Sequence, residues 1–166
     1  MAEADSTQQA QALGRRARAA ARKLAAAGTG AKNAALVAMA GRLRARTDGI
    51  VKENAAEVAA GREAGLSPAM IDRLTLTPER IEKMARSVEE IAELRDPVGE
   101  VIEGYVRPTG LEIQRVRVPI GVILVIYESR PNVTSDVAAL CLKSGNAAIL
   151  RGGKESIRSN LAIHRA

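Results

Sequence analysis

The residues of this sequence that could do chemistry gather directly after two short apolar runs. The first run, 119–127, is rich in Ile and Val and is followed by the polar segment ESRPN at 128–132. The second run, 147–150, is followed by RGGK at 151–154. Ligands of open α/β sheets sit beyond the carboxyl ends of the strands. If both runs are strands of one parallel sheet, these polar segments form one ligand-binding edge.

A strand–helix–strand unit is the element that would position these two segments. The first run suits a strand buried on both faces. Pro131 suits the first turn of a helix, and Gly145 suits the position just past its end. Between them apolar residues recur at helical spacing: Val133, Val137, Leu140 and Cys141. The strand at 147–150 would then lie parallel to the first, joined to it by a right-handed crossover.

The chain before residue 97 reads as helices. The expected spans are 8–27, 31–46, 49–63, 68–74 and 78–94. Ser67 and Thr77 each precede a proline and predict helix starts, and Thr47 with Asp48 offers a further cap. Core-facing stripes are predicted at the following residues: Leu36, Met39, Ala40 and Leu43; Ile50, Val51, Ala55 and Val58; Ile81, Met84, Ala85, Val88 and Ile91.

The spacing of the apolar residues changes after Asp96-Pro97, where a hairpin is predicted. Its strands would be 101–107 and 111–118, joined through Pro108-Thr109-Gly110. Polar side chains alternate with apolar ones in the second strand, which predicts one solvated face. The chain ends inside a helix predicted from about Glu155, and a two-stranded parallel sheet is too small to stand alone. We therefore expect the chain to be truncated.

The basic charge of the chain is concentrated near its start. The formal net charge is +6 and the sequence pI is about 10.0. Nine cations precede residue 47: Arg15, Arg16, Arg18, Arg22, Lys23, Lys32, Arg42, Arg44 and Arg46. One alternative is a basic helical nucleic-acid-binding module at 8–46. A solvated helix face is favoured over it, because acidic residues increase later and no aromatic stacking platform exists.

The single cysteine and single histidine limit the chemistry that this chain can do. The single cysteine excludes an internal disulfide and fits a reducing compartment, so a cytoplasmic protein is expected. No signal peptide and no apolar run of membrane-spanning length is visible. Cys141 lies in the helical run ALCLK and is interpreted as a buried small apolar residue. His164 is expected on an exposed helix face, and no metal-ligand cluster is present.

Several blocks of the sequence resemble one enzyme family. They are DRLTL (72–76), DPVGEVIEGYVRP (96–108), GLEIQRVRVPIGV (110–122), YESRPNVT (127–134) and LKSGNAAILRGGKE (142–155). Together they are similar to the γ-glutamyl phosphate reductases (glutamate-5-semialdehyde dehydrogenases) of the aldehyde dehydrogenase superfamily. The implied fold class is α/β and aldehyde-dehydrogenase-like. It divides into an N-terminal helical part (1–97), a hairpin and oligomerisation arm (98–118), and the incomplete start of a Rossmann-like NADP-binding domain (119–166).

The resemblance implies an activity and its partners. The activity is the NADPH-dependent reduction of L-glutamate 5-phosphate to L-glutamate 5-semialdehyde and phosphate, in L-proline biosynthesis. The family attacks with a cysteine thiolate and forms a thioester, because a thiolate both attacks and leaves well. That nucleophile lies downstream of this chain and Cys141 is not it, so the fragment alone is expected to be inactive. A homo-oligomer and the glutamate 5-kinase of the pathway are the implied protein partners, with no membrane and no nucleic acid.

The resemblance also assigns a role to the segment at 151–154. Many aldehyde dehydrogenases have Lys and Glu where this chain has Arg151 and Lys154, and there they hold the adenosine ribose. Two cations with Gly152 and Gly153 fit a 2′-phosphate, which argues for NADP over NAD. The alternative is a basic surface turn after a strand. No GxGxxG motif occurs.

The segment after the first strand aligns with the part of the superfamily that runs beneath the nicotinamide. Tyr127, Glu128 and Ser129 are therefore candidate cofactor-binding residues. Asn132 or Ser129 is the candidate oxyanion donor, with a cap of the turn as the alternative role for Asn132. Arg130 and Asn132 are candidate substrate-binding residues, with a salt bridge as the alternative for Arg130. A non-catalytic relative that retains cofactor binding is a further possibility.

Overall fold

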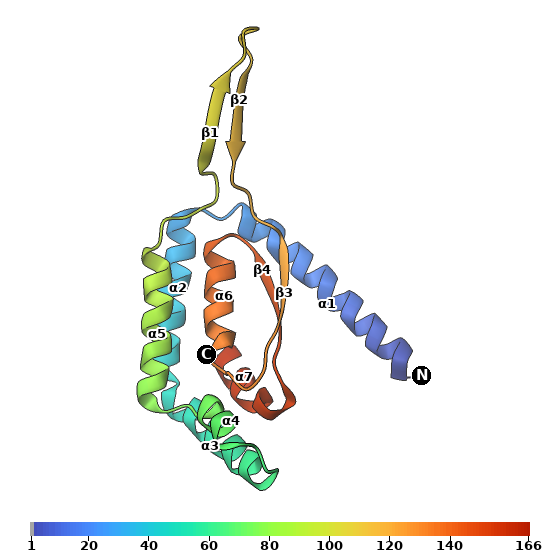
Figure 1. Cartoon of the computed structure of the whole chain (residues 1–166), viewed down its shortest axis with the longest axis vertical. Coiled ribbons are helices and arrows are strands. Elements are labelled where there is room, and N and C mark those ends of the chain that lie inside the picture. Colours follow the sequence, from blue (N-terminus) through green and yellow to red (C-terminus); the bar gives the residue numbers. More distant parts are fainter. Residues whose placement is uncertain (1) are drawn as a thin grey trace.

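Five helices make up the first part of the chain, which the computed structural model describes from residue 2 to residue 166, with side chains from residue 6. They are α1 (Ala2–Ala25), α2 (Thr29–Ala45), α3 (Thr47–Glu63), α4 (Pro68–Leu74) and α5 (Pro78–Glu93). All five predicted helices are present, and the helix predicted to start near residue 8 starts at Ala2. Figure 1 shows α2 and α5 side by side, with α1 running away from them at an angle.

The main hydrophobic core joins α2 and α5 to a later helix, α6 (Val133–Lys143). Leu36 on α2, together with Ile81 and Val88 on α5, is fully buried. The predicted stripes of α2 and α5 are thus confirmed. On α3 the prediction was wrong for Ala55, which is exposed. The buried residues of that helix include polar Asn54, whose side chain donates to the Leu74 carbonyl and accepts from the Leu76 backbone N–H.

Two of the three predicted caps are confirmed. The Ser67 hydroxyl accepts from the backbone N–H of Met70, and the Thr77 hydroxyl accepts from that of Arg80, each followed by proline. The cap at Thr47 was wrong. Its hydroxyl donates backward to the Leu43 and Arg44 carbonyls and closes the end of α2, because α3 begins directly at Thr47.

Ion pairs fasten the helices that carry much of the basic charge. Lys32 is buried and its Nζ lies 2.9 Å from the Asp96 carboxylate. Arg44 on α2 bonds to both Glu82 and Glu89 on α5. These three ion pairs neutralise the charges of Lys32 and Arg44, which weakens the nucleic-acid alternative.

A hairpin stands away from the rest of the molecule. Strands β1 (Val101–Val106) and β2 (Glu112–Val116) pair antiparallel, as predicted, and Figure 1 shows them extending beyond the helices. The predicted solvated face is confirmed, and the opposite face of the hairpin is exposed as well. Val106 and Leu111 are 65% and 60% exposed, because no described element packs against either face of the hairpin.

The strand–helix–strand unit follows as predicted. Strands β3 (Val122–Ile126) and β4 (Ala147–Arg151) pair in parallel, and α6 connects them. Figure 1 shows this small sheet between α6 and α1. The expectation that the first strand is buried on both faces was wrong for Leu124 and Ile126, which are exposed, since β3 has only one strand neighbour among the described residues. Leu140 of α6 is exposed as well.

After β4 the chain forms a short 3-10 turn, η1 (Lys154–Ser156), and then α7 (Ile157–His164). The buried Glu57 carboxylate on α3 accepts from the Arg158 and Ser159 backbone N–H groups at the start of α7. These two hydrogen bonds fix the direction in which the chain leaves the segment at 151–154. Among the described residues, no helix combines the length and apolar character that a membrane crossing needs.

Candidate functional site

The two polar segments predicted as a ligand-binding edge do meet. Both follow the carboxyl ends of the paired strands β3 and β4, and the Tyr127 backbone N–H donates to the Arg151 carbonyl at 3.1 Å. Ser129 is buried and has a φ of 41°, a left-handed conformation that is uncommon outside glycine. Its backbone N–H and its hydroxyl both donate to Glu155 Oε1, at 2.8 and 3.0 Å. The loop after β3 is therefore tied directly to the loop after β4.

Glu155 is the site residue that sequence reasoning missed. Burial acts to raise the pKa of its carboxyl, but its own backbone N–H, the Ser129 donors and nearby Lys154 outweigh burial and hold the pKa below its ordinary value. The available signal was a carboxylate next to two glycines and a lysine. The partner lies 26 residues away in the sequence, and spacing alone does not reveal it.

Polar side-chain ends lie close to both glycines of this loop. A Cβ on Gly152 would lie 2.1 Å from the Asn160 amide nitrogen, and a Cβ on Gly153 would lie 2.1 Å from the Glu155 carboxylate. Arg151 and Lys154, which flank them, are exposed. Neither side chain has an ion-pair or hydrogen-bond partner within the part of the chain that the structure describes. Two unpaired cations therefore remain available to an anionic ligand.

A chain of hydrogen bonds lies behind these loops. The Tyr127 hydroxyl bonds to Thr134 Oγ1 at 2.7 Å, and Thr134 donates to the Asn160 amide oxygen at 3.1 Å. Asn160 donates in turn to the Ser156 hydroxyl, which donates to the Gly153 carbonyl. Tyr127 is thus placed beneath the loop after β4 rather than free at its surface.

The loop after β3 faces two different environments. Ser129 points toward Glu155, whereas Arg130 and Asn132 line a cavity of about 380 Å³ together with residues of α4 and α5. The Asn132 side-chain amide donates to Asp136 at 2.9 Å. Arg130 is exposed and forms no salt bridge with the described residues. The candidates for cofactor contact and for substrate contact therefore fall on opposite sides of one loop.

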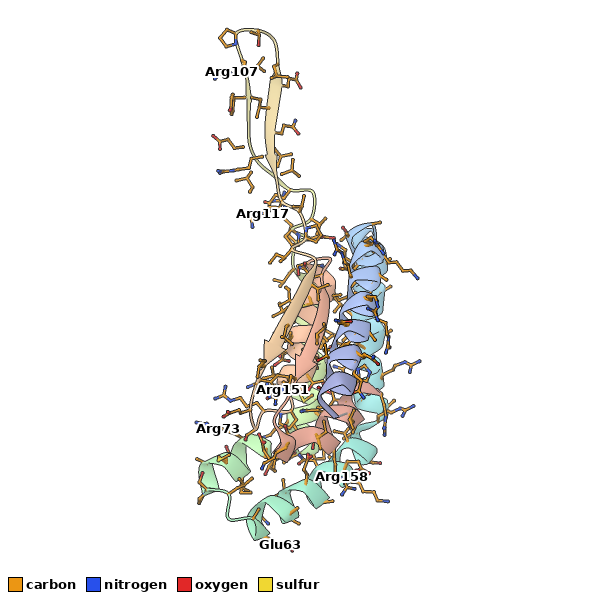
Figure 2. The ribbon with its side chains drawn as sticks, turned by 90° about the vertical axis from the view of Figure 1, so that its right-hand side faces the viewer. Glu63, Arg73, Arg107, Arg117, Arg151 and Arg158 are labelled. Atoms are coloured by element: carbon orange, nitrogen blue, oxygen red, sulfur yellow. The ribbon has the colours of Figure 1, made fainter. Side chains whose placement is uncertain are left out.

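Figure 2 shows where the charged groups lie along the molecule. Arg151 and Arg73 are at the end where β3 and β4 finish, whereas Arg107 and Arg117 mark the hairpin at the opposite end. Glu128 is exposed and has no hydrogen-bond or ion-pair partner among the described residues. The polar segments that follow β3 and β4 thus lie at one end of the molecule, away from the hairpin.

Cys141 does not belong to this site. It is 5% exposed within α6, and burial raises the pKa of its thiol above the ordinary value. A buried thiol of raised pKa is a poor nucleophile, which confirms its interpretation as a packing residue. His164 is exposed at the end of α7, as expected. Within the described residues no group of His, Cys, Asp and Glu could hold a metal ion.

The arrangement of helical layer, projecting hairpin and strand–helix–strand unit is that of the aldehyde dehydrogenases. A probable aldehyde dehydrogenase from Listeria monocytogenes matches 95% of this chain and 32% of its own, with a TM-score of 0.67 at 16% identity, which shows the fold alone. By sequence the chain is similar to the γ-glutamyl phosphate reductases. The γ-glutamyl phosphate reductase of Rhodospirillum rubrum is 64% identical to it over 153 residues, which cover 92% of this chain and 36% of that protein.

Solved structures of that family agree closely with this one. The γ-glutamyl phosphate reductase of Thermotoga maritima has a TM-score of 0.87 at 46% identity, over 90% of this chain and 36% of that one. The Saccharomyces cerevisiae protein has a TM-score of 0.88 at 36% identity, over 91% and 38%. The chain thus spans about a third of the length of the relatives that it matches. No protein-family model matches it.

Proposed function

We propose that this chain forms the cofactor-binding edge and part of the substrate site of an enzyme that reduces L-glutamate 5-phosphate to L-glutamate 5-semialdehyde and phosphate with NADPH, in L-proline biosynthesis. The observation that carries the proposal is the Ser129–Glu155 contact, which joins two loops at the carboxyl ends of parallel strands. The names of its relatives, γ-glutamyl phosphate reductases, support the same reaction.

The residues after β4 fit a phosphorylated dinucleotide. Arg151 and Lys154 are exposed and unpaired within the described chain, and Gly152 and Gly153 keep the backbone between them bare. Two cations suit the 2′-phosphate of NADPH, whereas a carboxylate at these positions would repel it. We propose that Arg151 and Lys154 hold this phosphate and that Tyr127, Glu128 and Ser129 lie toward the nicotinamide. When bound, NADPH supplies the hydride for the reduction.

Asn132 is the better of the two candidates for the oxyanion donor. Both donors of Ser129 are engaged by Glu155. The Asn132 amide gives one N–H to Asp136, and its second N–H has no partner among the described residues. Asn132 also lines the cavity that contains Arg130. We therefore propose that Asn132 stabilises the negative charge that develops on the oxygen of the reacting carbonyl. Arg130 then binds the phosphate of the substrate.

The nucleophile of the reaction is proposed to come from elsewhere in the whole protein. Thiolate attack needs an accessible sulfur with a pKa near or below neutral. Cys141 is buried and its pKa is raised, so it meets neither condition. It is also the single cysteine of the 166 residues.

The hairpin is proposed to be an oligomerisation arm. It exposes apolar side chains on both of its strands. Monomeric proteins rarely expose long apolar strands, because such edges pair with other chains. A second copy of the chain is the partner that we propose.

The experiment that tests the cofactor assignment compares two dinucleotides on one pair of variants. In the full chain, Arg151→Ala with Lys154→Ala should weaken NADPH binding by about tenfold or more and change NADH binding little, because only NADPH has the 2′-phosphate. Binding is measured directly through the fluorescence of the reduced nicotinamide. The control is Arg42→Ala with Arg46→Ala, which removes one exposed cation in the last turn of α2 and one just after it. Equal losses for both dinucleotides would refute the 2′-phosphate assignment.

A further inference from the structure

The cavity beside Arg130 carries a charge arrangement that the sequence blocks did not reveal. Its volume is about 380 Å³, within the range of small-molecule sites. Two consecutive helices form it, at the end of α4 and on one face of α5, together with a distant segment, the loop before α6 and its first turn. Leu76 and Met84 are buried and supply its apolar wall.

Three cations of this cavity lack an internal counter-ion. Arg73 on α4, Lys83 on α5 and Arg130 are all exposed and all line the cavity. None of them has an ion-pair or hydrogen-bond partner among the described residues. Arg80 differs, because its guanidinium bonds to the Asp72 carboxylate and to the Asp72 and Thr75 carbonyls. The cavity therefore offers uncompensated positive charge on two sides.

One carboxylate in the same cavity, that of Asp136, has no cationic partner among the described residues. Asp136 accepts hydrogen bonds from the Asn132 amide at 2.9 Å and from the Ser135 hydroxyl at 3.5 Å. It forms no salt bridge within the described part of the chain. Burial raises the pKa of Asp136 against the effect of these two donors. A carboxylate that is partly removed from water and lacks a counter-ion attracts a cation placed beside it.

We propose that this cavity recognises the amino-acid end of an acidic α-amino acid, with Arg73 and Lys83 binding the α-carboxylate and Asp136 binding the α-ammonium group. A glutamyl phosphate carries an α-carboxylate, a phosphate and an α-ammonium group. The cavity offers cations for the two anionic ends and a carboxylate for the ammonium group. Arg130 and Asn132 remain for the phosphoryl end and the reacting carbonyl. The inference rests on the proposed function for the identity of the substrate, and it assigns the residues that select an α-amino acid over a simple diacid.

The test uses L-glutamate and glutarate, which share two carboxylates and differ by the ammonium group. Binding to the full chain is measured by calorimetry without any dinucleotide. The intact chain should bind L-glutamate at least about tenfold more tightly than glutarate, since a charged hydrogen bond is added. Asp136→Asn should lower L-glutamate affinity to the glutarate level and leave glutarate affinity unchanged or higher.

A second variant keeps the test independent of any effect of Asp136→Asn on folding. Arg73→Gln with Lys83→Gln changes two exposed side chains and should weaken both ligands by about tenfold or more. The matched control, Arg42→Gln with Arg46→Gln, changes two exposed cations outside the cavity and should leave both affinities intact. Equal affinity for the two ligands, or equal effects of the cavity pair and the control pair, would overturn the inference. Because no dinucleotide is present, a failure of this test would not contradict the NADPH assignment. A failure of the NADPH test would likewise leave this inference intact.

Discussion

Ser129 and Glu155 are joined by two hydrogen bonds that connect the ends of β3 and β4, from the Ser129 backbone N–H at 2.8 Å and from its hydroxyl at 3.0 Å. The contact holds Ser129 in a left-handed conformation with a φ of 41°. Such a conformation is costly for a residue other than glycine and persists where the surroundings impose it. Glu155 is therefore the residue that fixes the spacing of the two loops.

Removal of the Glu155 carboxylate should destabilise the chain and weaken NADPH binding. Glu155→Ala leaves two Ser129 donors without an acceptor, and we expect a loss of about 1–3 kcal/mol in the free energy of unfolding. The measurement is urea denaturation alongside NADPH titration. The control is Glu63→Ala at the exposed end of α3. Equal stability of the two variants would show that the contact is unimportant.

The same contact should make stability depend on pH in a defined direction. The folded-state pKa of Glu155 lies below its ordinary value of 4.5, so its contribution is fully present above about pH 4.5 and is lost as the pH falls through the lower folded value. Glu155→Gln has no such titration. The difference in unfolding free energy between the intact chain and this variant should therefore shrink below pH 4.5. A difference that is constant with pH would contradict the assignment.

Lys143 should be a structural lysine whose loss is costly. It is 3% exposed at the end of α6, and its Nζ donates to Asn33 Oδ1 at 2.6 Å and to the Ala92 carbonyl at 2.8 Å. Lys143→Met keeps the aliphatic length but leaves both acceptors unpaired, at about 1–3 kcal/mol. Thermal unfolding measures this, with the exposed Lys52→Met as the control. A Lys143 variant as stable as the Lys52 variant would exclude this role.

Gly145 and Gly99 provide a matched pair for separating backbone strain from steric overlap. Both have positive φ, 73° and 84°, but a Cβ on Gly145 would lie 2.9 Å from Pro119 Cγ, whereas nothing lies within 4 Å of a Cβ on Gly99. Gly99→Ala should cost about 1–2 kcal/mol from the left-handed conformation alone. Gly145→Ala should cost more. Equal unfolding free energies, measured by urea denaturation, would mean that Pro119 moves aside freely.

The hairpin should determine the oligomeric state without affecting the protomer. Val106→Ser with Leu111→Ser removes two exposed apolar side chains near its tip, and the mass in solution should fall to that of a monomer. Light scattering after gel filtration measures this mass. Val37→Ser with Leu94→Ser is the control, since both residues are 55% exposed on the helical part. An unchanged mass in the hairpin variant would refute the proposed arm.

Local sequence patterns predicted much of the fold and one part of the site. The stripe of α5 and the caps at Ser67 and Thr77 depend on neighbours three or four residues away, so periodicity reveals them. The loops after β3 and β4 were predictable because parallel strands end at the same edge. The exposed faces of the hairpin and of β3 were not, because burial depends on which elements pack against a strand.

The sequence by itself determined the order of helices and strands, the parallel pairing of β3 with β4, and the similarity to the γ-glutamyl phosphate reductases. Tertiary structure alone decided that Glu155 accepts from Ser129, that Ser129 and Asn132 face different sides of one loop, and that Arg73 and Lys83 share a cavity with Asp136. The reason is physical. Periodicity and turn chemistry act between residues close in the chain, whereas these contacts join segments that only the packing of α4, α5 and α6 brings together.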